Sequence, residues 1–550
     1  MQFQENGLST GKCALENMLD TCSALEDILS NSFGPNSANA LLHDNCGKLI
    51  LSAQSVAILN AIKVQDPRDK TLVAAALAFY KQHGNGGKSF VMFLHRLLRH
   101  LTFGVTQAKG LQHLQSFKLY FLNQLLSELR VNCYVTCSSN ERDKIRETAS
   151  NIVRTSLQGK LFRNLHDIVS SLVLKLAFTK DVLLNVCIDE TIDCFDDIVI
   201  DVAARPVTDS RVLEGIIIQR DLLVHCPRTL LACSAVVVVL HCDVTVENDL
   251  NLQYQGSVSD WLQFKARLLQ QFVQRLAQHN VSLLLVRGKA SEALAEYCKK
   301  ADVSVIHYVS DDDVARLQRY TGIQPVDAFT DVVDANCRAT VSSCSLTDCY
   351  GVKGVLLCGF SNSSNHTAPP RHILLCAPSQ GMCRQIASLI LASFKVLRAW
   401  LTPPTGFDKT SESHLYHHVA GGAAFELTLC RAINTLLATA PDISCDMRDA
   451  LTRFVTSLYD IPLLLVRNSY GGGTRHRLTS VDLQRISSKP RDNDAFDNHV
   501  NTVVGVNAKS GVSFLSEDTC VIEPASSKVQ MVLDAIDVAI QLVRIDASVT

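Results

Sequence analysis

The sequence predicts a multidomain α and α/β protein, in which helical regions at both ends of the chain flank an α/β region. Apolar residues recur at helical spacing before residue 178 and after residue 412. Between residues 198 and 376, valine-rich runs alternate with helical stretches, as in an α/β unit. A length of 550 residues is enough for about three or four domains.

The N-terminal region is expected to be mainly helical, because its apolar residues recur every three or four positions. The helices are expected at 13–33, Thr71–Tyr80, Ser89–Leu129 and twice within Asp143–Phe178. Phe33-Gly34-Pro35 ends the first of them, since glycine and proline stop helices. A short strand pair is expected between them, Lys48–Leu51 with Val56–Leu59.

The middle of the chain changes character at Ile198. Strands are expected at Val212–Ile218, Val236–Leu240, Val281–Val286, Val303–Val309 and His372–Cys376. Helices are expected at Trp261–Leu276, Ala290–Lys300, Asp313–Tyr320 and Met382–Leu401. From Glu412 the chain is expected to be helical again, through Ala424–Leu437, Asp446–Leu465 and Ser527–Val543, with a hairpin at 503–506 and 512–515. This order suggests one domain built from both chain ends, with others inserted.

Composition excludes several classes of protein. Lysine and arginine (52) nearly balance aspartate and glutamate (54), so no nucleic-acid partner is expected. The apolar run Leu230–Leu240 is too short to span a bilayer and is expected to be a buried strand, so no membrane insertion is expected. Residues 1–12 lack the apolar core of a signal peptide. The 20 cysteines are scattered without a Cys-x-x-Cys pair, which predicts buried thiols in a reducing, cytoplasmic setting and no metal site.

The stretch Gly84-Asn85-Gly86-Gly87-Lys88-Ser89 is the main candidate binding segment. Its glycines let the backbone approach a ligand closely, and consecutive N–H groups could form an anion nest. It is not a P-loop, because Gln82 stands where the first glycine is needed and a helix precedes it. We expect a glycine turn between two helices, which on local sequence alone is more often a plain connection.

Other candidate features have structural explanations. His414, His417 and His418 lie beside a loop without partner ligands and are expected to be exposed. Gly471–Gly473 is expected to be a surface loop. A dinucleotide-binding enzyme is not expected, because no Gly-x-Gly-x-x-Gly follows the strand at Val281–Val286.

Several blocks in order resemble the group II chaperonin family, which includes the cytosolic chaperonin and the thermosome. The blocks are Ser32–Pro35, Leu51–Leu59, Gly84–Ser89, Leu213–Ile218, Val314–Val326, Val419–Glu426, Ile461-Pro462, Asn468, Glu523-Pro524 and Arg544–Asp546. Each block is short, but together they cover nearly the whole chain in the family's order. The resemblance implies a group II chaperonin subunit with a helical equatorial domain, an intermediate domain and an inserted α/β apical domain.

The resemblance also implies domain boundaries and binding residues. The equatorial domain would comprise residues 1–135 and 403–550, the intermediate domain 136–205 and 351–402, and the apical domain 206–350. ATP would be contacted by Gly34, Pro35, Gly84, Asn85, Gly86, Gly87, Lys88, Ser89, Gly421, Gly422 and Glu523.

The sequence departs from the family where its acidic side chains hold magnesium and orient the attacking water. The three positions map to Asn85, Gln54 and approximately Ala392, none of which is a carboxylate. Asn36 and Ser37 replace the family's lysine and second glycine. Phosphoryl transfer depends on positioning and electrostatics, so hydrolysis is expected to be very slow or absent. ATP binding stays open, because the backbone of the turn is retained and Lys88 adds a charge. Magnesium binding is not expected, and we assign no catalytic or metal-binding residue.

The segment Gly86–Leu98 is most similar to one member of the divergent chaperonin-like proteins of the Bardet–Biedl-syndrome group, whose loop reads Gly-Ala-Lys-Thr-Phe. This likeness implies a cytoplasmic subunit, at the ciliary base or centrosome, that works with cytosolic chaperonin subunits and its chaperonin-like relatives. Together they would assist assembly of the BBSome, a coat complex for ciliary membrane traffic. The alternative is an active ATP-dependent chaperonin subunit for cytosolic clients that uses other acids, such as Asp66 or Asp69, although both are expected to form a solvated helix start.

Overall fold

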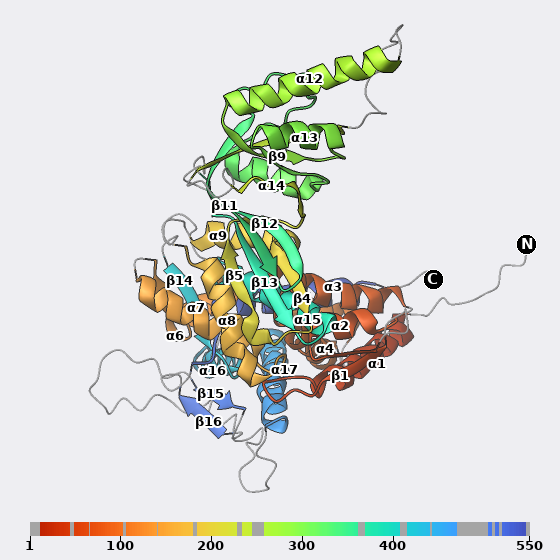
Figure 1. Cartoon of the computed structure of the whole chain (residues 1–550). Helices are drawn as coiled ribbons and strands as arrows, with labels where there is room; N and C mark the ends of the chain where they lie inside the picture. The colour runs from red at the N-terminus through yellow and green to blue at the C-terminus, as the bar shows by residue number, and fades with distance from the viewer. Residues whose placement is uncertain are drawn as a thin grey trace, which may run out of the picture. The chain divides into compact units, whose positions relative to one another are not determined.

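The computed structural model divides the chain into two compact units (Figure 1). Unit 1 comprises residues 1–174 and 389–550, and unit 2 comprises residues 175–388. The residues described are 11–43, 49–64, 66–102, 106–139, 141–179, 184–227, 234–244, 258–360, 369–406, 415–440, 443–469, 504–508, 512–515 and 520–545.

Unit 1 is a helical assembly arranged around helix α4 (Gly87–Thr102). Its other helices are α1 (Gly11–Ser30), α2 (Ser55–Ala61), α3 (Pro67–His83), α5 (Gln107–Tyr120), a π-helical turn (Phe121–Leu125), α6 (Leu126–Asn132), α7 (Arg142–Leu157), α16 (Ala424–Thr439), α17 (Cys445–Arg467) and α19 (Ala525–Val543). Helices α8 (Arg163–Ala177) and α15 (Gln380–Leu401) each begin in one unit and end in the other. Helix α4 contacts α1, α3, α5, α17 and α19. It is therefore buried by elements from both ends of the chain.

The core around α4 is apolar and aromatic. Phe93 of α4 meets Phe454 of α17 edge-on, with ring centroids 5.8 Å apart, and both side chains are fully buried. Phe117 of α5 stacks on the other side of Phe454 at 3.6 Å. Aromatic groups bury the largest areas per residue, so this cluster makes a large contribution to the stability of unit 1.

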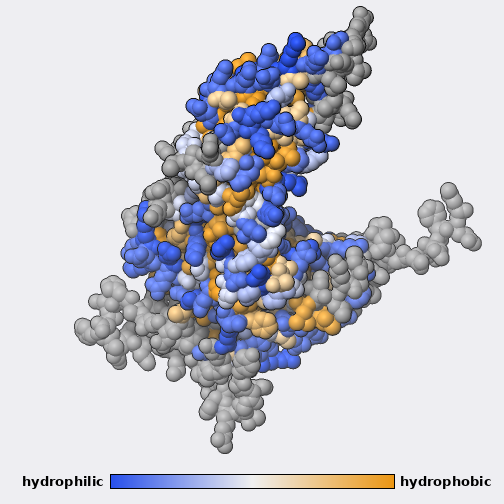
Figure 2. All heavy atoms as spheres, in the orientation of Figure 1, coloured by the Kyte–Doolittle hydropathy of each residue, from blue (hydrophilic) through white to orange (hydrophobic). Residues whose placement is uncertain are grey.

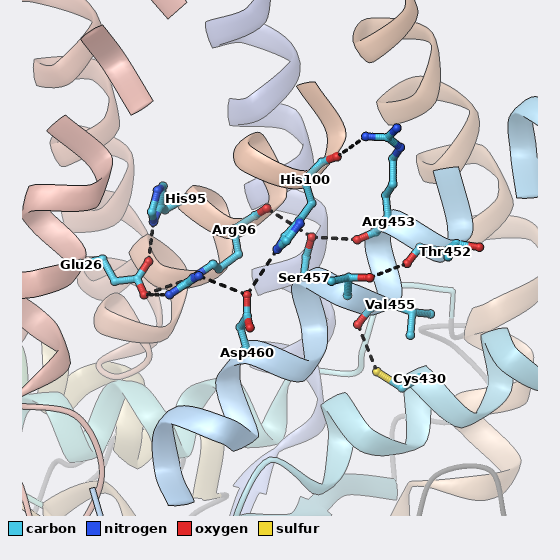
Figure 3. Close-up of polar contacts among 11 residues, drawn as sticks. Glu26, His95, Arg96, His100, Cys430, Thr452, Arg453, Val455, Ser457 and Asp460 are labelled. Atoms are coloured by element: carbon cyan, nitrogen blue, oxygen red, sulfur yellow. Dashed lines mark hydrogen bonds and ion pairs between the residues drawn. The ribbon is translucent and has the colours of Figure 1, made fainter. Parts of the chain in front are cut away.

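A polar network ties α1, α4 and α17 together beside this core (Figure 3). The carboxylate of Glu26 accepts hydrogen bonds from His95 and from Arg96, whose Nε lies 3.1 Å from Oε1. Arg96 and His100 each approach Oδ2 of Asp460 at 3.4 Å. Burial raises the pKa of Glu26, but its hydrogen bonds to His95 and Arg96 and their charges lower that pKa below its usual value overall. The network therefore holds charged groups that are paired.

Strands in unit 1 form small sheets. A hairpin joins β1 (Ala40–His43) to β2 (Leu49–Ser52), and another joins β15 (Val504–Asn507) to β16 (Val512–Leu515). The third sheet places β14 (Leu415–Ala420) between β17 (Ile522–Pro524) and β3 (Val135–Ser138), antiparallel to both. It brings together three segments that are far apart in the sequence.

Unit 2 contains a mixed seven-stranded sheet with helices on both faces. The strand order is β6 (Ile216–Ile218), β12 (Val352–Phe360), β11 (Arg338–Cys349), β8 (Ala235–Leu240), β9 (Val281–Val286), β10 (Ser304–Ile306) and β7 (Leu222–Val224). Alternate side chains of β8 and β9 face α12 (Val258–Gln278) and α13 (Glu292–Lys300) on one face and α14 (Asp311–Thr321) on the other. Burial on both faces explains why these strands are continuous apolar runs.

The rest of unit 2 is a three-stranded sheet with short helices. Strand β13 (Arg371–Ala377) lies between β4 (Val199–Ala203) and β5 (Arg211–Glu214). The short helical elements are α9 (Leu184–Asp193), α10 (Phe195–Ile198) and a 3₁₀ turn at Val207–Asp209.

Most of the predicted elements are confirmed, and a few are corrected. Val56–Leu59, expected to be a strand, lies within helix α2. The segment after Glu412, expected to be helical, forms strand β14 where the structure describes it. Val212–Ile218 is two strands in different sheets, separated by Gly215 at a φ of 113°. The long hairpin of β11 and β12 was not expected from the sequence.

The face of the molecule drawn in Figure 2 is mostly hydrophilic, with scattered hydrophobic patches. Most cysteines that the structure describes are buried, as predicted. Within the described residues, no helix is long and apolar enough to cross a membrane.

Candidate functional site

The glycine turn between α3 and α4 forms as predicted. Helix α3 begins at Pro67, where Asp66 caps it by accepting from the N–H of Arg68 at 2.8 Å. It ends at Gly84, whose φ of 71° lies in the left-handed region and whose N–H donates to Tyr80 O at 2.7 Å. A Cβ at Gly84 would lie 2.1 Å from the carbonyl oxygen of Ala392. Glycine is therefore required here both by the backbone conformation and by space.

The three positions mapped to the family's acids lie around this turn, and all three are neutral. Asn85 is in the turn itself, and Ala392 lies against Gly84. Gln54 precedes helix α2, whose first residue, Ser55, lies against Gly87. Gln54 and Ala392 are 3% and 5% exposed, so neither position is open to solvent. The structure thus brings these positions together and shows no carboxylate at any of them.

Two lysines approach the same turn. Nζ of Lys88, the second residue of α4, donates to the carbonyl oxygen of Ser32. Nζ of Lys160, in the loop between α7 and α8, donates to Oδ1 of Asn85 at 2.9 Å. Burial and the charge of Lys160 lower the pKa of Lys88 to about 7. Burial also lowers the pKa of Lys160 to about 8, although Glu523 acts in the opposite direction. Sequence reasoning missed Lys160, because it lies 75 residues from Asn85 and carries no local motif.

The first turn of the site, Phe33–Ser37, is tied to the loop that carries Lys160. Gly34 has a φ of 87°, and a Cβ at Gly159 would lie 2.4 Å from its carbonyl oxygen. Ser37 Oγ donates to Gly159 O. Asn36 turns its amide to Ala508 O at 2.9 Å and Asn468 O at 3.4 Å. The Asn36 side chain is therefore hydrogen-bonded to backbone carbonyl groups of the protein. Pro35 lies in the same turn.

Glu523 belongs to a buried charge cluster on the other side of the site. It lies on β17 opposite Val419 of β14, and its Oε2 is 2.9 Å from Nζ of Lys528. Lys528 also lies 3.0 Å from Oε1 of Glu426, whose side chain is 1% exposed. The charges of Glu426 and Glu523 raise the pKa of Lys528 against the effect of burial. Glu523 is thus committed to an ion pair.

Gly421 and Gly422 form the turn from β14 into α16 and shape the backbone there. The N–H of Gly421 donates to Val521 O at 2.8 Å, and a Cβ at Gly421 would lie 2.6 Å from the Val521 side chain. Gly422 has a φ of 65° and accepts from the N–H of Val506 at 2.8 Å. These two glycines do not line the pocket described next.

A small pocket lies beside the glycine turn, within unit 1. Asn85, Gly86 and Ser89 line one side, and Glu523 lines another. Much of the remaining wall is apolar: Phe79, Ile152, Val396, Pro524 and Met531. His83 also lines it, and burial together with the charge of Arg398 lowers the pKa of His83 to about 4. Residues of the glycine turn and Glu523 thus line one pocket, and much of the wall between them is apolar.

Several other predictions have outcomes in the structure. His417 and His418 are 4% and 7% exposed, so the expectation that they are exposed is wrong; they lie on β14, a strand with neighbours on both sides. Asp69 is 8% exposed, not solvated as expected, and burial raises its pKa. His414 and Gly471–Gly473 lie outside the described residues. In the part of the chain that the structure describes, no three His, Cys, Asp or Glu side chains form a metal-binding group.

Chemically, the site can attract an anion, but the three positions mapped to the family's acids are neutral, and the carboxylate of Glu523 is paired with Lys528. Backbone N–H groups at the start of α4 and the Lys160 ammonium lie at the glycine turn, and the Lys88 ammonium lies at the neighbouring carbonyl of Ser32. Hydrolysis of a nucleotide requires charge placement that neutral side chains do not supply.

The chain is similar to known proteins of one family. The model of the TCP-1/cpn60 chaperonin family matches residues 25–550. The BBSome complex assembly protein BBS10 of Pongo abelii is 25% identical over 420 residues, which cover 69% of this chain and 56% of that protein. For BBS10 of Mus musculus the values are 25% over 427 residues, 70% and 58%. This chain therefore spans little more than half the length of the BBS10 proteins it matches.

More distant relatives are covered more completely. The thermosome subunit alpha of Archaeoglobus fulgidus is 21% identical over 556 residues, which cover 98% of this chain and 92% of that subunit. The likeness to BBS10 confirms the likeness to the Bardet–Biedl-syndrome group that the segment Gly86–Leu98 indicated. From the match over residues 25–550, the chain belongs to the TCP-1/cpn60 chaperonin family.

Proposed function

We propose that this protein is a chaperonin-like assembly factor that helps to fold and assemble the BBSome and does not turn over ATP. The observation that carries the proposal is the neutral character of Asn85, Gln54 and Ala392 around a retained glycine turn. The likeness to proteins named for BBSome complex assembly supports the client. Its partners would be cytosolic chaperonin subunits and other Bardet–Biedl chaperonin-like proteins.

We expect no ATP turnover because each missing electrostatic group slows phosphoryl transfer strongly. Removing one preorganised electrostatic group from an active site typically costs ~3 kcal/mol of transition-state stabilisation, or a factor of ~10²–10³ in rate. Such losses do not simply add within one catalytic unit. Three neutral positions in one site nevertheless remove the acids that would orient water, and the carboxylate of Glu523 is paired with Lys528.

The residues at the turn fit a nucleotide better than they fit magnesium. Mg²⁺ is held by carboxylate and phosphate oxygens, and Asn85, Gln54 and Ala392 supply no carboxylate. Lys88 and Lys160 would also repel a divalent cation there. A nucleotide phosphate chain, in contrast, would meet backbone N–H groups and two ammonium groups.

The proposed setting is the cytoplasm, at the ciliary base or centrosome. The division into equatorial, intermediate and apical domains with the boundaries given above remains part of the proposal. The alternative, an active chaperonin ATPase, would need another acid. Asp66 is used to cap α3, and Asp69 is buried with a raised pKa, so the structure gives this alternative no added support.

Two measurements test the proposal. The first is the size and composition of complexes that co-purify with the tagged full chain from ciliated cells, by sedimentation and mass spectrometry. Recovery of chaperonin subunits and BBSome components is expected. A homomeric ring without these partners would contradict the assembly role.

The second measurement is phosphate release from ATP by the pure chain in excess Mg²⁺. We expect a rate no higher than that of a buffer control. Robust Mg²⁺-dependent release would contradict the loss of turnover and support the active ATPase.

A further inference from the structure

Lys88 and Lys160 belong to two separate elements, and their ammonium groups lie beside the neighbouring segments around Ser32 and Asn85. Lys88 lies in the first turn of α4, and Lys160 lies in the loop after α7. Their ammonium groups donate to neutral oxygens, the carbonyl of Ser32 and the amide of Asn85. The charge of Lys160 acts on Lys88, so the two groups lie within electrostatic reach of each other.

No carboxylate of the described residues pairs with either ammonium group. Among the described residues, no carboxylate oxygen lies within 4 Å of either Nζ. The acid that acts on Lys160, Glu523, is already paired with Lys528 at 2.9 Å. Two like charges that are half-buried without a counter-charge are unfavourable unless an anion joins them. The lowered pKa values of both groups are consistent with that imbalance.

The surrounding backbone also favours an anion. Helix α4 is 16 residues long and begins at Gly87, so its unpaired N–H groups lie next to Lys88. Gly84 and Gly86 both have positive φ, which turns the backbone of the segment between α3 and α4. The three carboxylate positions of the family would have repelled such an anion without a metal ion between them, but here all three are neutral.

We propose that the ammonium groups of Lys88 and Lys160 replace the divalent cation, so that the phosphate chain of a nucleoside triphosphate binds as a metal-free anion. When both are protonated, they supply two positive charges, as one Mg²⁺ would. This inference rests on the proposed function, because it assumes that the retained glycine turn is the nucleotide site. It goes beyond that function by naming the ionic form of the ligand and the residues that select it.

The direct test is equilibrium binding of ATP to the full chain in EDTA and in excess Mg²⁺. We expect affinity in EDTA to equal or exceed affinity in Mg²⁺, because a bound Mg²⁺ would lie against two ammonium groups. Tripolyphosphate in place of ATP separates recognition of the phosphates from recognition of the base. Competition by tripolyphosphate in EDTA is expected.

Three substitutions locate the effect. Lys88→Met and Lys160→Met should each weaken metal-free binding about tenfold to hundredfold, the range for a charge-assisted hydrogen bond. Asn85→Asp has nearly the same shape and places a carboxylate 2.9 Å from Lys160. It should weaken metal-free binding about tenfold and make binding depend on Mg²⁺. Lys144→Met is the matched control, because the Lys144 side chain is 69% exposed, and it should leave binding unchanged.

The outcomes separate this inference from the assembly role. Binding that is lost in EDTA, or that is unaffected by Lys88→Met and Lys160→Met, would overturn the inference. Absence of nucleotide binding under both conditions would also overturn it, but would leave the assembly role to be judged by co-purifying partners. Asn85→Asp keeps the result interpretable if either lysine variant fails to fold.

Discussion

The packed helices of unit 1 and its glycine turn both bury charged groups, but they treat them in opposite ways. Lys528 lies between Glu426 and Glu523, and those carboxylates raise its pKa. Lys88 lies between a carbonyl oxygen and another lysine, and its pKa falls to about 7. A buried lysine thus forms a stabilising ion pair at Lys528, whereas at Lys88 its charge has no carboxylate partner among the described residues. A buried charge without a counter-charge is a candidate binding site, whereas a buried charge in an ion pair can be purely structural.

The largest expected loss of stability comes from breaking the charge cluster of Glu426, Lys528 and Glu523. Lys528→Met would leave Glu426, whose side chain is 1% exposed, without its cation. Removing one partner of a buried ion pair typically costs about 3–5 kcal/mol. We expect a loss of that size in the free energy of unfolding, measured by urea denaturation. Lys144→Met, at an exposed position, serves as the control and should change stability by less than about 0.5 kcal/mol.

The backbone of the glycine turn can be tested without changing any charge. Gly84→Ala would place a Cβ 2.1 Å from Ala392 O at a φ of 71°, so α3 and α15 would have to separate. We expect a loss of about 3 kcal/mol in the free energy of unfolding. Gly322→Ala is the matched variant, because Gly322 caps α14 at a φ of 69° with nothing within 4 Å of the added Cβ. It should cost only about 1 kcal/mol. Equal losses would show that space at Gly84 is not the constraint.

A smaller effect is expected in the Glu26 network, where the sign of the pH dependence can be checked. The pKa of Glu26 is lowered in the folded protein, so its stabilisation is present above the usual pKa of a glutamate and is lost as pH falls through the lowered value. Glu26→Gln should therefore reduce the free energy of unfolding by about 2 kcal/mol at pH 7. The difference from the unsubstituted protein should shrink below about pH 4. A difference that does not depend on pH would mean that the carboxylate charge is not what stabilises the network.

The smallest expected effect is a gain in stability, from substitution of Lys88. The pKa of Lys88 lies below its usual value, so the folded protein binds fewer protons than the unfolded chain between about pH 7 and pH 10. The charge therefore destabilises the fold at pH 7 and below, and this penalty disappears as pH rises. Lys88→Met should stabilise the protein by about 1 kcal/mol at pH 7, after allowing for partial exposure, and by almost nothing near pH 10. Destabilisation at pH 7 would show that the ammonium group is compensated after all.

The sequence predicted those elements whose pattern is local and long. The amphipathic helices and the buried strands β8 and β9 carry enough apolar residues to define their period. Val56–Leu59 is only four residues long, so its apolar run does not distinguish a strand from helix α2. Strand β14 depends on pairing with β3 and β17, which lie far away in the sequence, and the same pairing buries His417 and His418.

Only the part of the candidate site that has a local sequence pattern was predicted. Gly84–Ser89 and the neutral positions Asn85 and Gln54 are visible as motifs. The contact between Lys160 and Asn85, and the charge cluster around Lys528, arise only when distant segments meet. A resemblance gives the position of a motif, but the electrostatic balance around it depends on residues outside every motif.

The position of helix α4 has a consequence for the synthesis of the protein. Its partners α17 and α19 end at residues 467 and 543, so the last of them leaves the ribosome about 440 residues after α4 itself. At a translation rate of about 5–20 residues per second, roughly 20–90 s pass between the synthesis of α4 and that of the last helix that packs on it. Residues 175–388 can be completed during that interval. The nascent chain is therefore exposed to aggregation through the apolar face of α4 until its C-terminal helices have been made.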